Sequence, residues 1–308
     1  MQKPQVNLCL LTYKRPDLFR RAFESALSQV FVRCPDVRYR VTVVDNDPAA
    51  SARPIFEEMA NGSRAELAYA SEMKPGIARA RNRALDESEN FEFMAFLDDD
   101  EVAPPNWLDN LMAALRKYNA DVVTGPVRPC FESAPDWVIQ GGFFAEEQRE
   151  TGSIPKFVAS NNVLMKCGVA LRFRFDERFN NTSGEDTHYF MRIRDTGAKI
   201  VWSREAIVEE FVPASRTTEE WIVQRCYSNG NRYTRCCLYL YPGARTVAVR
   251  SVKGIAFILT GLLSLPLARG KLDRKVKSWS KVKRGIGICS AVIGKADVYY
   301  RKPGVTAS

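Results

Sequence analysis

Four consecutive carboxylates, Asp98, Asp99, Asp100 and Glu101, follow the apolar run at residues 93–97. Such a run is typical of a buried strand, so this strand would end in four adjacent negative charges. Gathering these charges is costly unless a cation lies opposite them. Mg²⁺ or Mn²⁺ prefers carboxylate oxygens and keeps coordination positions for phosphate. The stretch therefore predicts a metal site, with a solvated acidic turn before the next helix as the simpler alternative.

The order of the four carboxylates suggests that they have different roles. Alternate side chains of an extended segment point the same way, so Asp98 and Asp100 should share one side and Asp99 the other. One of these two could meet a ribose or hold the metal through water, and the other could bind the metal directly. Asp99 should support them, and Glu101 should face solvent.

Two earlier strand-like runs, at residues 6–11 and 41–44, also end in polar side chains. These are Thr12 and Tyr13 after the first run, and Asp45, Asn46 and Asp47 after the second. Between the runs, one face of a helix repeats at Phe19, Ala22, Phe23, Ala26, Leu27 and Val30. A strand, a helix and a second strand predict parallel pairing. Because ligands of open parallel sheets bind beyond the carboxyl ends of the strands, we expect these polar groups to share one edge with the acidic cluster.

Helix and strand patterns continue to alternate along the chain. We expect helices over 77–85, 106–117 and 187–196, strands over 121–124 and 199–202, and a long loop over 130–155. The pattern predicts an α/β fold with a mixed, mainly parallel sheet flanked by helices. We assign it to a catalytic domain at residues 1–240.

The net charge of +9 is concentrated near the end of the 308-residue chain. Residues 245–302 carry fourteen basic and two acidic side chains, a net of +12, so the rest of the chain has a net of −3. A nucleic-acid enzyme would more often carry its basic groups over the catalytic face, and we expect no nucleic-acid partner. The eight scattered cysteines and single histidine argue against zinc and favour reduced thiols in a cytosolic protein.

The basic region at residues 241–308 reads as membrane-associating helices. Residues 254–268 lack charge, but a spanning helix needs about twenty apolar residues. Basic clusters follow at 271–277 and 281–284. A short apolar segment with such flanks favours in-plane or re-entrant attachment to an anionic membrane surface. A buried helix pair and a true transmembrane helix remain as alternatives.

Six motifs in order resemble glycosyltransferase family 2, the nucleotide-sugar transferases with the GT-A fold. They are LLTYKRPDLFRRAFESALSQ, VVDND, GIARARNRAL, FLDDDEVAPPNWLDNL, GEDTHYFMRIRDTGAKIVW and QRCYSNGNRY. Together they cover most of residues 5–235. Within the family, the chain is most similar to bacterial exopolysaccharide β-glucosyltransferases of the succinoglycan-assembly type.

The resemblance implies nucleotide and metal contacts for particular residues. Those expected at the nucleotide or its phosphates are Thr12, Tyr13, Asp45 (accepting from the uracil N3–H), Asp47, Arg81, Asn82, Asp98, Asp99 and Arg225. Asp98 and Asp100 match the outer acids of the family's D-x-D signature, which holds Mg²⁺ or Mn²⁺ on the diphosphate. For two of the three α-helical arginines Arg79, Arg81 and Arg83, a solvated helix face is the preferred reading. For Arg225, that reading and diphosphate contact are equally open.

The pair Glu185-Asp186 is the second acidic centre. The resemblance makes Asp186, more than Glu185, the general base that deprotonates an acceptor hydroxyl. A carboxylate there also stabilises an oxocarbenium-like transition state. The same two acids fit a helix N-terminus, where the dipole favours them, and both roles can hold together. We expect the lone histidine, His188, to be packed or exposed.

One departure from the family pattern concerns the metal. Many relatives place a histidine just before a Val-Pro after the last sheet strand, whereas this chain has Glu209-Glu210-Phe211-Val212-Pro213. Either Glu210 replaces that ligand or the metal has fewer protein ligands.

These inferences predict an inverting, metal-dependent glycosyltransferase that uses a UDP-sugar, with UDP-glucose first. Its expected acceptor is a polyprenyl-diphosphate-linked oligosaccharide, and its expected location is the cytoplasmic side of the inner membrane, as a peripheral protein. A nucleotidyltransferase that makes a nucleotide-sugar would normally have a glycine-rich phosphate loop after the first strand, which TYKRPD lacks. A non-catalytic scaffold subunit with the same fold is the third possibility.

Overall fold

The computed structural model describes residues 5–63, 65–145 and 147–297, and these form two compact units. The first unit holds the described residues within Met1–Pro129, Glu146–Asn180 and Glu185–Phe211. The second holds those within Cys130–Ala145, Asn181–Gly184 and Val212–Ser308. Helix α8 (Glu219–Leu240) groups with the C-terminal helices in the second unit, whereas the predicted catalytic domain at residues 1–240 includes it.

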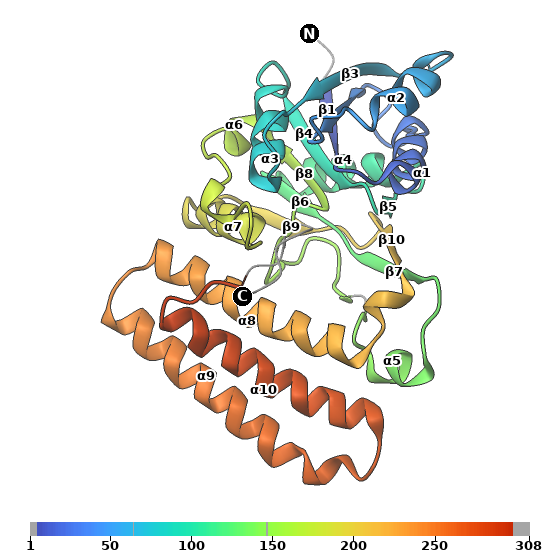
Figure 1. Cartoon of the computed structure of the whole chain (residues 1–308). Coiled ribbons are helices and arrows are strands. Elements are labelled where there is room, and N and C mark those ends of the chain that lie inside the picture. Colours follow the sequence, from blue (N-terminus) through green and yellow to red (C-terminus); the bar gives the residue numbers. More distant parts are fainter. Residues whose placement is uncertain (1–4, 64, 146, 298–308) are drawn as a thin grey trace. The chain divides into compact units, whose positions relative to one another are not determined.

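A seven-stranded sheet forms the centre of the first unit (Figure 1). Its strands, in spatial order, are β3 (Glu66–Ser71), β2 (Arg38–Asp45), β1 (Gln5–Thr12), β4 (Phe93–Asp98), β8 (Asn162–Lys166), β6 (Val122–Thr124) and β9 (Ile200–Trp202). Strands β3, β2, β1 and β4 pair in parallel, as do β6 and β9. Only β8 runs antiparallel to its neighbours in this sheet. The expected mixed, mainly parallel sheet is confirmed.

Apolar cores cover both faces of this sheet. The helices whose buried side chains join the first core are α1 (Pro16–Leu27), α2 (Arg53–Ala60) and α4 (Trp107–Tyr118). Those of the second core are α3 (Ile77–Asp86), α6 (Cys167–Ala170) and α7 (Glu185–Asp195). Strand β4 shows why its sequence is continuously apolar: Phe93, Ala95 and Leu97 enter the first core, while Met94 and Phe96 enter the second.

Most expected elements form within a few residues of their predicted bounds, with two differences. Helix α1 ends at Leu27, so Val30, which we had placed on its buried face, is 50% exposed. The expected loop at 130–155 contains part of β7 (Val127–Phe131) and helix α5 (Asp136–Gly141). Strand β7 belongs to a small three-stranded sheet in the order β5 (Glu101–Val102), β10 (Val208–Val212), β7.

Three long helices dominate the second unit: α8, α9 (Ala244–Ser264) and α10 (Leu272–Val292). Helix α10 contacts both of the others and lies between them (Figure 1). Helix α9 begins ten residues before the uncharged segment that we had predicted and stops before Pro266. In the described part of the chain, α9 is the one helix whose length and composition would allow it to cross a membrane.

A buried asparagine ties several elements of the first unit together. Asn162, at the start of β8, accepts a hydrogen bond from Trp107 Nε1 at 2.9 Å. Its amide nitrogen donates to the carbonyl oxygens of Pro126 at 3.0 Å and Ala206 at 2.8 Å. Asn162 and Trp107 are both fully buried, so water cannot replace these bonds.

We predict that Asn162→Ala lowers the free energy of unfolding by about 3 kcal/mol, because it leaves the Trp107 donor and the Ala206 carbonyl without these partners, while Pro126 O keeps its bond from Val208 N. Urea unfolding followed by tryptophan fluorescence measures this. Asn90→Ala, at an exposed position, is the matched control and should change stability by less than about 0.5 kcal/mol. Equal effects of the two substitutions would contradict the assigned role.

Candidate functional site

The strand register brings the predicted polar residues to one edge of the large sheet. In the β1–β2 pair Thr12 lies opposite Asp45, and in the β1–β4 pair Leu11 lies opposite Asp98. Three parallel strands therefore end at the same level, each with a polar side chain at or near its last residue. The expected convergence at the carboxyl edge is confirmed.

The acidic cluster does not divide as simple alternation predicts. Strand β4 ends at Asp98, and Asp99 and Asp100 form a turn, so the extended geometry behind that prediction stops one residue too early. Arg15 Nη1 contacts Asp99 Oδ1 at 3.2 Å and Asp100 Oδ2 at 3.4 Å. Asp99 Oδ2 also accepts a hydrogen bond from Thr12 Oγ1 at 2.9 Å. Asp99 and Asp100 thus share the contact with Arg15, contrary to the expectation that Asp99 would lie on the other side from Asp100.

Glu101 is buried, which corrects the expectation that it faces solvent. It lies in β5, directly opposite Glu210 of β10 in the antiparallel register. Its carboxylate accepts a hydrogen bond from Asn161 Nδ2 at 2.6 Å. Burial raises the pKa of Glu101 well above its usual value, and repulsion from Asp98, Asp100 and Glu210 adds to this. Glu210 is therefore positioned beside the acidic cluster, although its role as a metal ligand stays a prediction.

Arg81 connects the two acidic centres. This arginine projects from α3 and is 6% exposed. Its Nη1 donates to Glu185 Oε1, and its Nη2 lies 3.9 Å from Asp98 Oδ1. The guanidinium also lies over the Phe175 ring, 5.6 Å from its centroid. A single buried cation therefore holds together the end of β4 and the start of α7.

The Glu185-Asp186 pair opens α7, as predicted for acids at a helix N-terminus. The two side chains have different surroundings. Glu185 is buried, its Oε2 has no hydrogen-bond partner among the described residues, and burial raises its pKa while Arg81 opposes that shift. Asp186 is half-buried and accepts hydrogen bonds from Thr187 N at 2.6 Å and Thr187 Oγ1 at 3.3 Å. Asp186 is therefore the more accessible of the two possible bases.

The pKa of Asp98 depends on charges from both acidic centres. Burial raises the pKa of Asp98 to about 7; Arg81 opposes the shift, and repulsion from Asp100, Asp99 and Asp186 adds to it. The Asp98 side chain is nevertheless 35% exposed, so a ligand can reach it. Arg81 contacts both Asp98 and Glu185, so the predicted metal ligand and the segment of the predicted base adjoin the same guanidinium.

The residues at the end of β2 shape the adjoining loops. Asp45 is fully buried and accepts hydrogen bonds from Tyr69 Oη at 2.7 Å, Ala52 N at 2.9 Å and Asp47 N at 2.9 Å. Asn46 donates to the carbonyl oxygens of Glu72 and Lys74, both at 3.0 Å, and accepts from Gly76 N at 2.7 Å. These bonds fix the connection into α3, and contact of Asp45 and Asp47 with a base stays a prediction.

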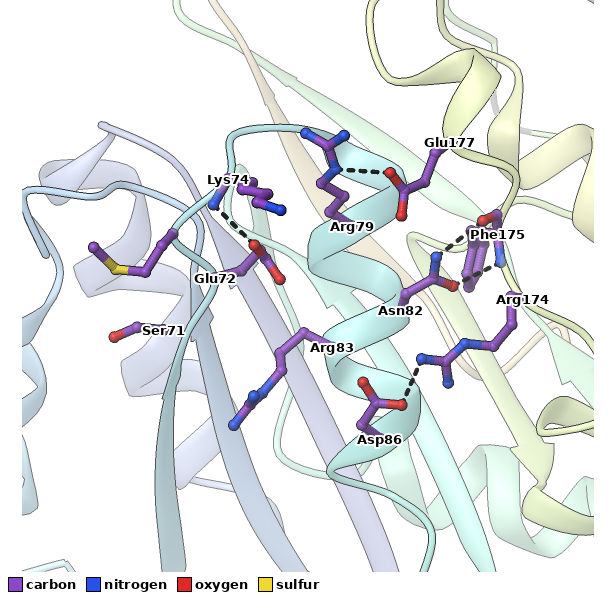
Figure 2. Close-up of a pocket in the computed structure, with 11 residues that line it drawn as sticks. Ser71, Glu72, Lys74, Arg79, Asn82, Arg83, Asp86, Arg174, Phe175 and Glu177 are labelled. Atoms are coloured by element: carbon purple, nitrogen blue, oxygen red, sulfur yellow. Dashed lines mark hydrogen bonds and ion pairs between the residues drawn. The ribbon is translucent and has the colours of Figure 1, made fainter.

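Asn82, Arg79 and Arg83 line a groove along α3 (Figure 2). Asn82 donates to the carbonyl of Phe175 at 2.9 Å and accepts from Phe175 N at 2.7 Å, so its amide holds α3 to the segment between α6 and α7. Arg79 pairs with Glu177 at 2.8 Å, and Arg83 pairs with Glu87 at 2.7 Å. These two arginines occupy the solvated helix face, as expected for two of the three. The groove residues include neither Asp98 nor Asp186.

Three further predicted residues lie in distinct settings. His188 is buried against Phe179, and burial lowers its pKa, which matches a packed histidine. Tyr13 is exposed just beyond the end of β1. Arg225 is on α8 in the second unit, where its guanidinium lies 5.7 Å from the centroid of the Trp221 ring. The contact of Arg225 with a diphosphate stays a prediction.

The donor set at this edge suits a divalent cation that phosphates also bind. In residues 5–63, 65–145 and 147–297, no three His, Cys, Asp or Glu side chains are arranged so that they could hold one metal ion. Mg²⁺ is commonly held by one or two carboxylates, with water and phosphate oxygens completing its shell. The accessible Asp98 carboxylate and the adjacent Asp100 fit that pattern, and a cation would relieve the repulsion within the cluster.

Sequence reasoning missed several residues that build the site. Arg15 supplies a counter-charge to Asp99 and Asp100, although it had only been part of a motif. Asn161 holds Glu101, and Asn180 accepts a hydrogen bond from Ala78 N at 3.0 Å in the first turn of α3. The available signals were the Asn161-Asn162 pair at the start of a strand and the Asn180-Asn181 pair three residues before Gly184, since amides in such positions commonly bond to backbone and carboxylates.

Proteins of known family are similar to this chain in sequence. The model of the family described as glycosyl transferase family 2 matches residues 8–178. The succinoglycan biosynthesis protein ExoM of Rhizobium meliloti (strain 1021) is 31% identical over 270 residues, which cover 85% of this chain and 86% of that protein.

Solved structures show the same fold at lower identity. A mannosyltransferase from Pyrobaculum calidifontis, in complex with GDP-Man and Mn²⁺, has a TM-score of 0.60 and 18% identity, covering 95% of this chain and 88% of that one. S. aureus TarS 1–349, in complex with UDP-GlcNAc, has a TM-score of 0.54 and 16% identity, covering 96% and 93%. The fold is GT-A, and the chain belongs to glycosyltransferase family 2.

Proposed function

We propose that this protein is an inverting glycosyltransferase that moves a sugar, with glucose as the first candidate, from a UDP-sugar to a lipid-linked oligosaccharide. The observation that carries the proposal is the buried Arg81, which joins Asp98 at the end of β4 to Glu185 at the start of α7. One site thereby contains carboxylates for a metal-bound diphosphate and a second, accessible carboxylate for a base. The similarity to a succinoglycan biosynthesis protein supports a role in exopolysaccharide synthesis.

Asp186 is the proposed base. Its carboxylate takes the proton of the acceptor hydroxyl as that oxygen attacks the anomeric carbon of the donor sugar. The bond between the anomeric carbon and the diphosphate oxygen breaks, and the nucleoside diphosphate leaves with the bonding electrons. A single displacement inverts the anomeric configuration, so an α-linked donor gives a β-glycoside.

The departing diphosphate is assigned to the Asp98–Asp100 side of the site. When bound there, Mg²⁺ or Mn²⁺ would neutralise the negative charge that develops on the leaving group. Asp98 and Asp100 would hold it, and Glu210 is a candidate third ligand through water. The complexes of two GT-A neighbours with nucleotide-sugars, one of them with Mn²⁺, support a nucleotide-sugar donor and a divalent cation.

The proposed acceptor, an oligosaccharide on a polyprenyl diphosphate, would be presented at a membrane. We accordingly propose that the protein works as a peripheral protein at the cytoplasmic side of the inner membrane. The apolar and basic C-terminal helices support this placement.

The first test supplies purified protein and Mg²⁺ or Mn²⁺ with UDP-glucose, UDP-galactose, UDP-GlcNAc and GDP-mannose. We predict that UDP-glucose is turned over fastest, both by slow hydrolysis and by transfer to lipid-linked acceptors read by intact mass. Asp186→Asn should lower transfer by about 10²- to 10⁴-fold, the usual contribution of a general base, while leaving UDP affinity unchanged.

Asp17→Asn is the matched control, because Asp17 is an exposed acid in the first turn of a different helix, α1. It should retain wild-type transfer. Undiminished transfer by Asp186→Asn would exclude the base assignment. If neither the wild type nor Asp186→Asn turns over any donor while both still bind nucleotide, the non-catalytic scaffold alternative would be favoured.

Arg81 gives a second test, because its removal leaves Glu185 buried without a counter-charge. We predict that Arg81→Met destabilises the protein by about 3–5 kcal/mol and abolishes turnover, whereas Arg79→Met, on the solvated face of the same helix, changes stability by less than about 1 kcal/mol. Chemical denaturation and the transfer assay measure the two effects.

The double variant Arg81→Met/Glu185→Gln separates structure from function. With the buried charge removed, stability should recover relative to Arg81→Met. Turnover should stay low if the guanidinium also serves the diphosphate. Stability of Arg81→Met equal to that of Arg79→Met would contradict the proposed bridge.

A further inference from the structure

A broad apolar face lies on α9, away from the other helices of the second unit. The five side chains that form it are between 45 and 75% exposed: Val252, Ile255, Leu259, Leu262 and Leu263. Their spacings of three, four, three and one residues place them on one side of the helix. Soluble proteins rarely leave such a continuous row of large aliphatic side chains in water.

The opposite side of α9 is closed by unusually tight contact with α10. A Cβ atom on Gly261 would lie 2.8 Å from Val282 N, and one on Gly285 would lie 2.5 Å from the carbonyl oxygen of Gly254. Only glycine allows the two backbones to approach so closely, an arrangement that is common where helices pack within lipid. The glycine contacts fix which side of α9 remains outside.

The polar side of the hairpin is strongly basic. Lys277, Lys281 and Arg284 are exposed and share one face of α10 by their spacings of four and three residues. Arg284 lies over the Phe257 ring of α9, 5.2 Å from its centroid. Phe257 is two residues from both Ile255 and Leu259, so it lies about 160° around α9 from them. The basic and apolar faces of the hairpin are therefore on opposite sides.

The dimensions favour a helix lying in the membrane surface rather than crossing it. The first ten residues of α9 contain Arg245, Arg250 and Lys253, and Arg250 is buried with its Nη2 donating to Thr234 Oγ1 at 2.7 Å. The uncharged remainder of α9 after Lys253 is eleven residues, about 17 Å of helix, whereas the hydrocarbon core of a bilayer is about 30 Å thick.

The charge of the α9–α10 hairpin indicates which partner covers the apolar face of α9. Residues 271–284 contain seven basic and one acidic side chain, a net of +6. A second copy of the chain packed on the apolar face would leave this positive charge without a counter-charge. An anionic lipid surface complements the charge and accepts the apolar side chains as well.

We propose that the α9–α10 hairpin inserts the Val252–Leu263 face in the plane of an anionic bilayer, with the basic residues of α10 at the headgroup level. The inference deepens the proposed function by naming the surface that would meet a lipid-linked acceptor. The role given to this surface rests on the proposed function, but the lipid binding itself does not, because it is measured without sugar transfer.

The test is sedimentation of the full chain with vesicles of phosphatidylcholine alone or of phosphatidylcholine mixed with phosphatidylglycerol. We expect binding to the mixed vesicles, weakening as salt rises. Leu259→Glu/Leu263→Glu should reduce the partition coefficient by at least about 100-fold, and Lys277→Gln/Lys281→Gln by about tenfold or more.

Matched controls come from the first unit. Val32→Glu/Ile154→Glu changes two apolar side chains that are at least as exposed as Leu259 and Leu263. Lys117→Gln/Lys199→Gln removes two exposed lysines. Both should bind as wild type. Circular dichroism and hydrolysis of UDP-sugar in solution check that each variant is folded, and a failure of hydrolysis in wild type would count against the proposed function alone.

Three results would overturn the inference. The first is absence of wild-type binding to either vesicle, and the second is binding that the Leu259→Glu/Leu263→Glu variant retains. The third is a wild-type dimer, measured by light scattering, that this variant converts to a monomer. If detergent releases the protein from the mixed vesicles but high salt at alkaline pH does not, α9 spans the bilayer instead of lying in its plane.

Discussion

The ion pairs of Arg81 are the interaction on which the site depends. Its guanidinium is buried among carboxylates that would otherwise repel one another, and it contacts one residue from each acidic centre. A buried charge without a partner costs several kcal/mol, so this arrangement holds only while both sides remain in place. Strand β4 and helix α7 are about ninety residues apart in the chain, and the arginine from α3 fixes their polar ends together.

The location of the site followed from the sequence because parallel strands must end at a common edge. The apolar runs set the strands; Thr12 then lies opposite Asp45, and Asp98 lies opposite Leu11, one residue earlier. What the sequence could not supply was the direction of each side chain beyond a strand end. The path of Asp99 and Asp100 depends on a turn, and their partner Arg15 comes from a different strand end.

The burial of Glu101 and Arg81 could not be predicted from the sequence either, because it depends on contacts with residues distant in the chain. Glu101 is enclosed because β5 pairs with β10, more than a hundred residues later, and because Asn161 approaches from the start of β8. The α3 segment contains three arginines at alternate positions, and local sequence treats them alike. Only the tertiary fold distinguishes Arg81, which is buried, from Arg79 and Arg83, which pair with acids near the surface.

The most direct measurement is the affinity for UDP by calorimetry with Mn²⁺ and with EDTA, in wild type and in Asp100→Ala. If the carboxyl edge of the sheet holds a metal-bound diphosphate, Mn²⁺ should strengthen UDP binding to the wild type by at least about tenfold, a coupling of about 1.4 kcal/mol. Asp100→Ala should lose this strengthening and keep the weaker, metal-free affinity. Equal UDP affinity with Mn²⁺ and with EDTA in the wild type would contradict the account.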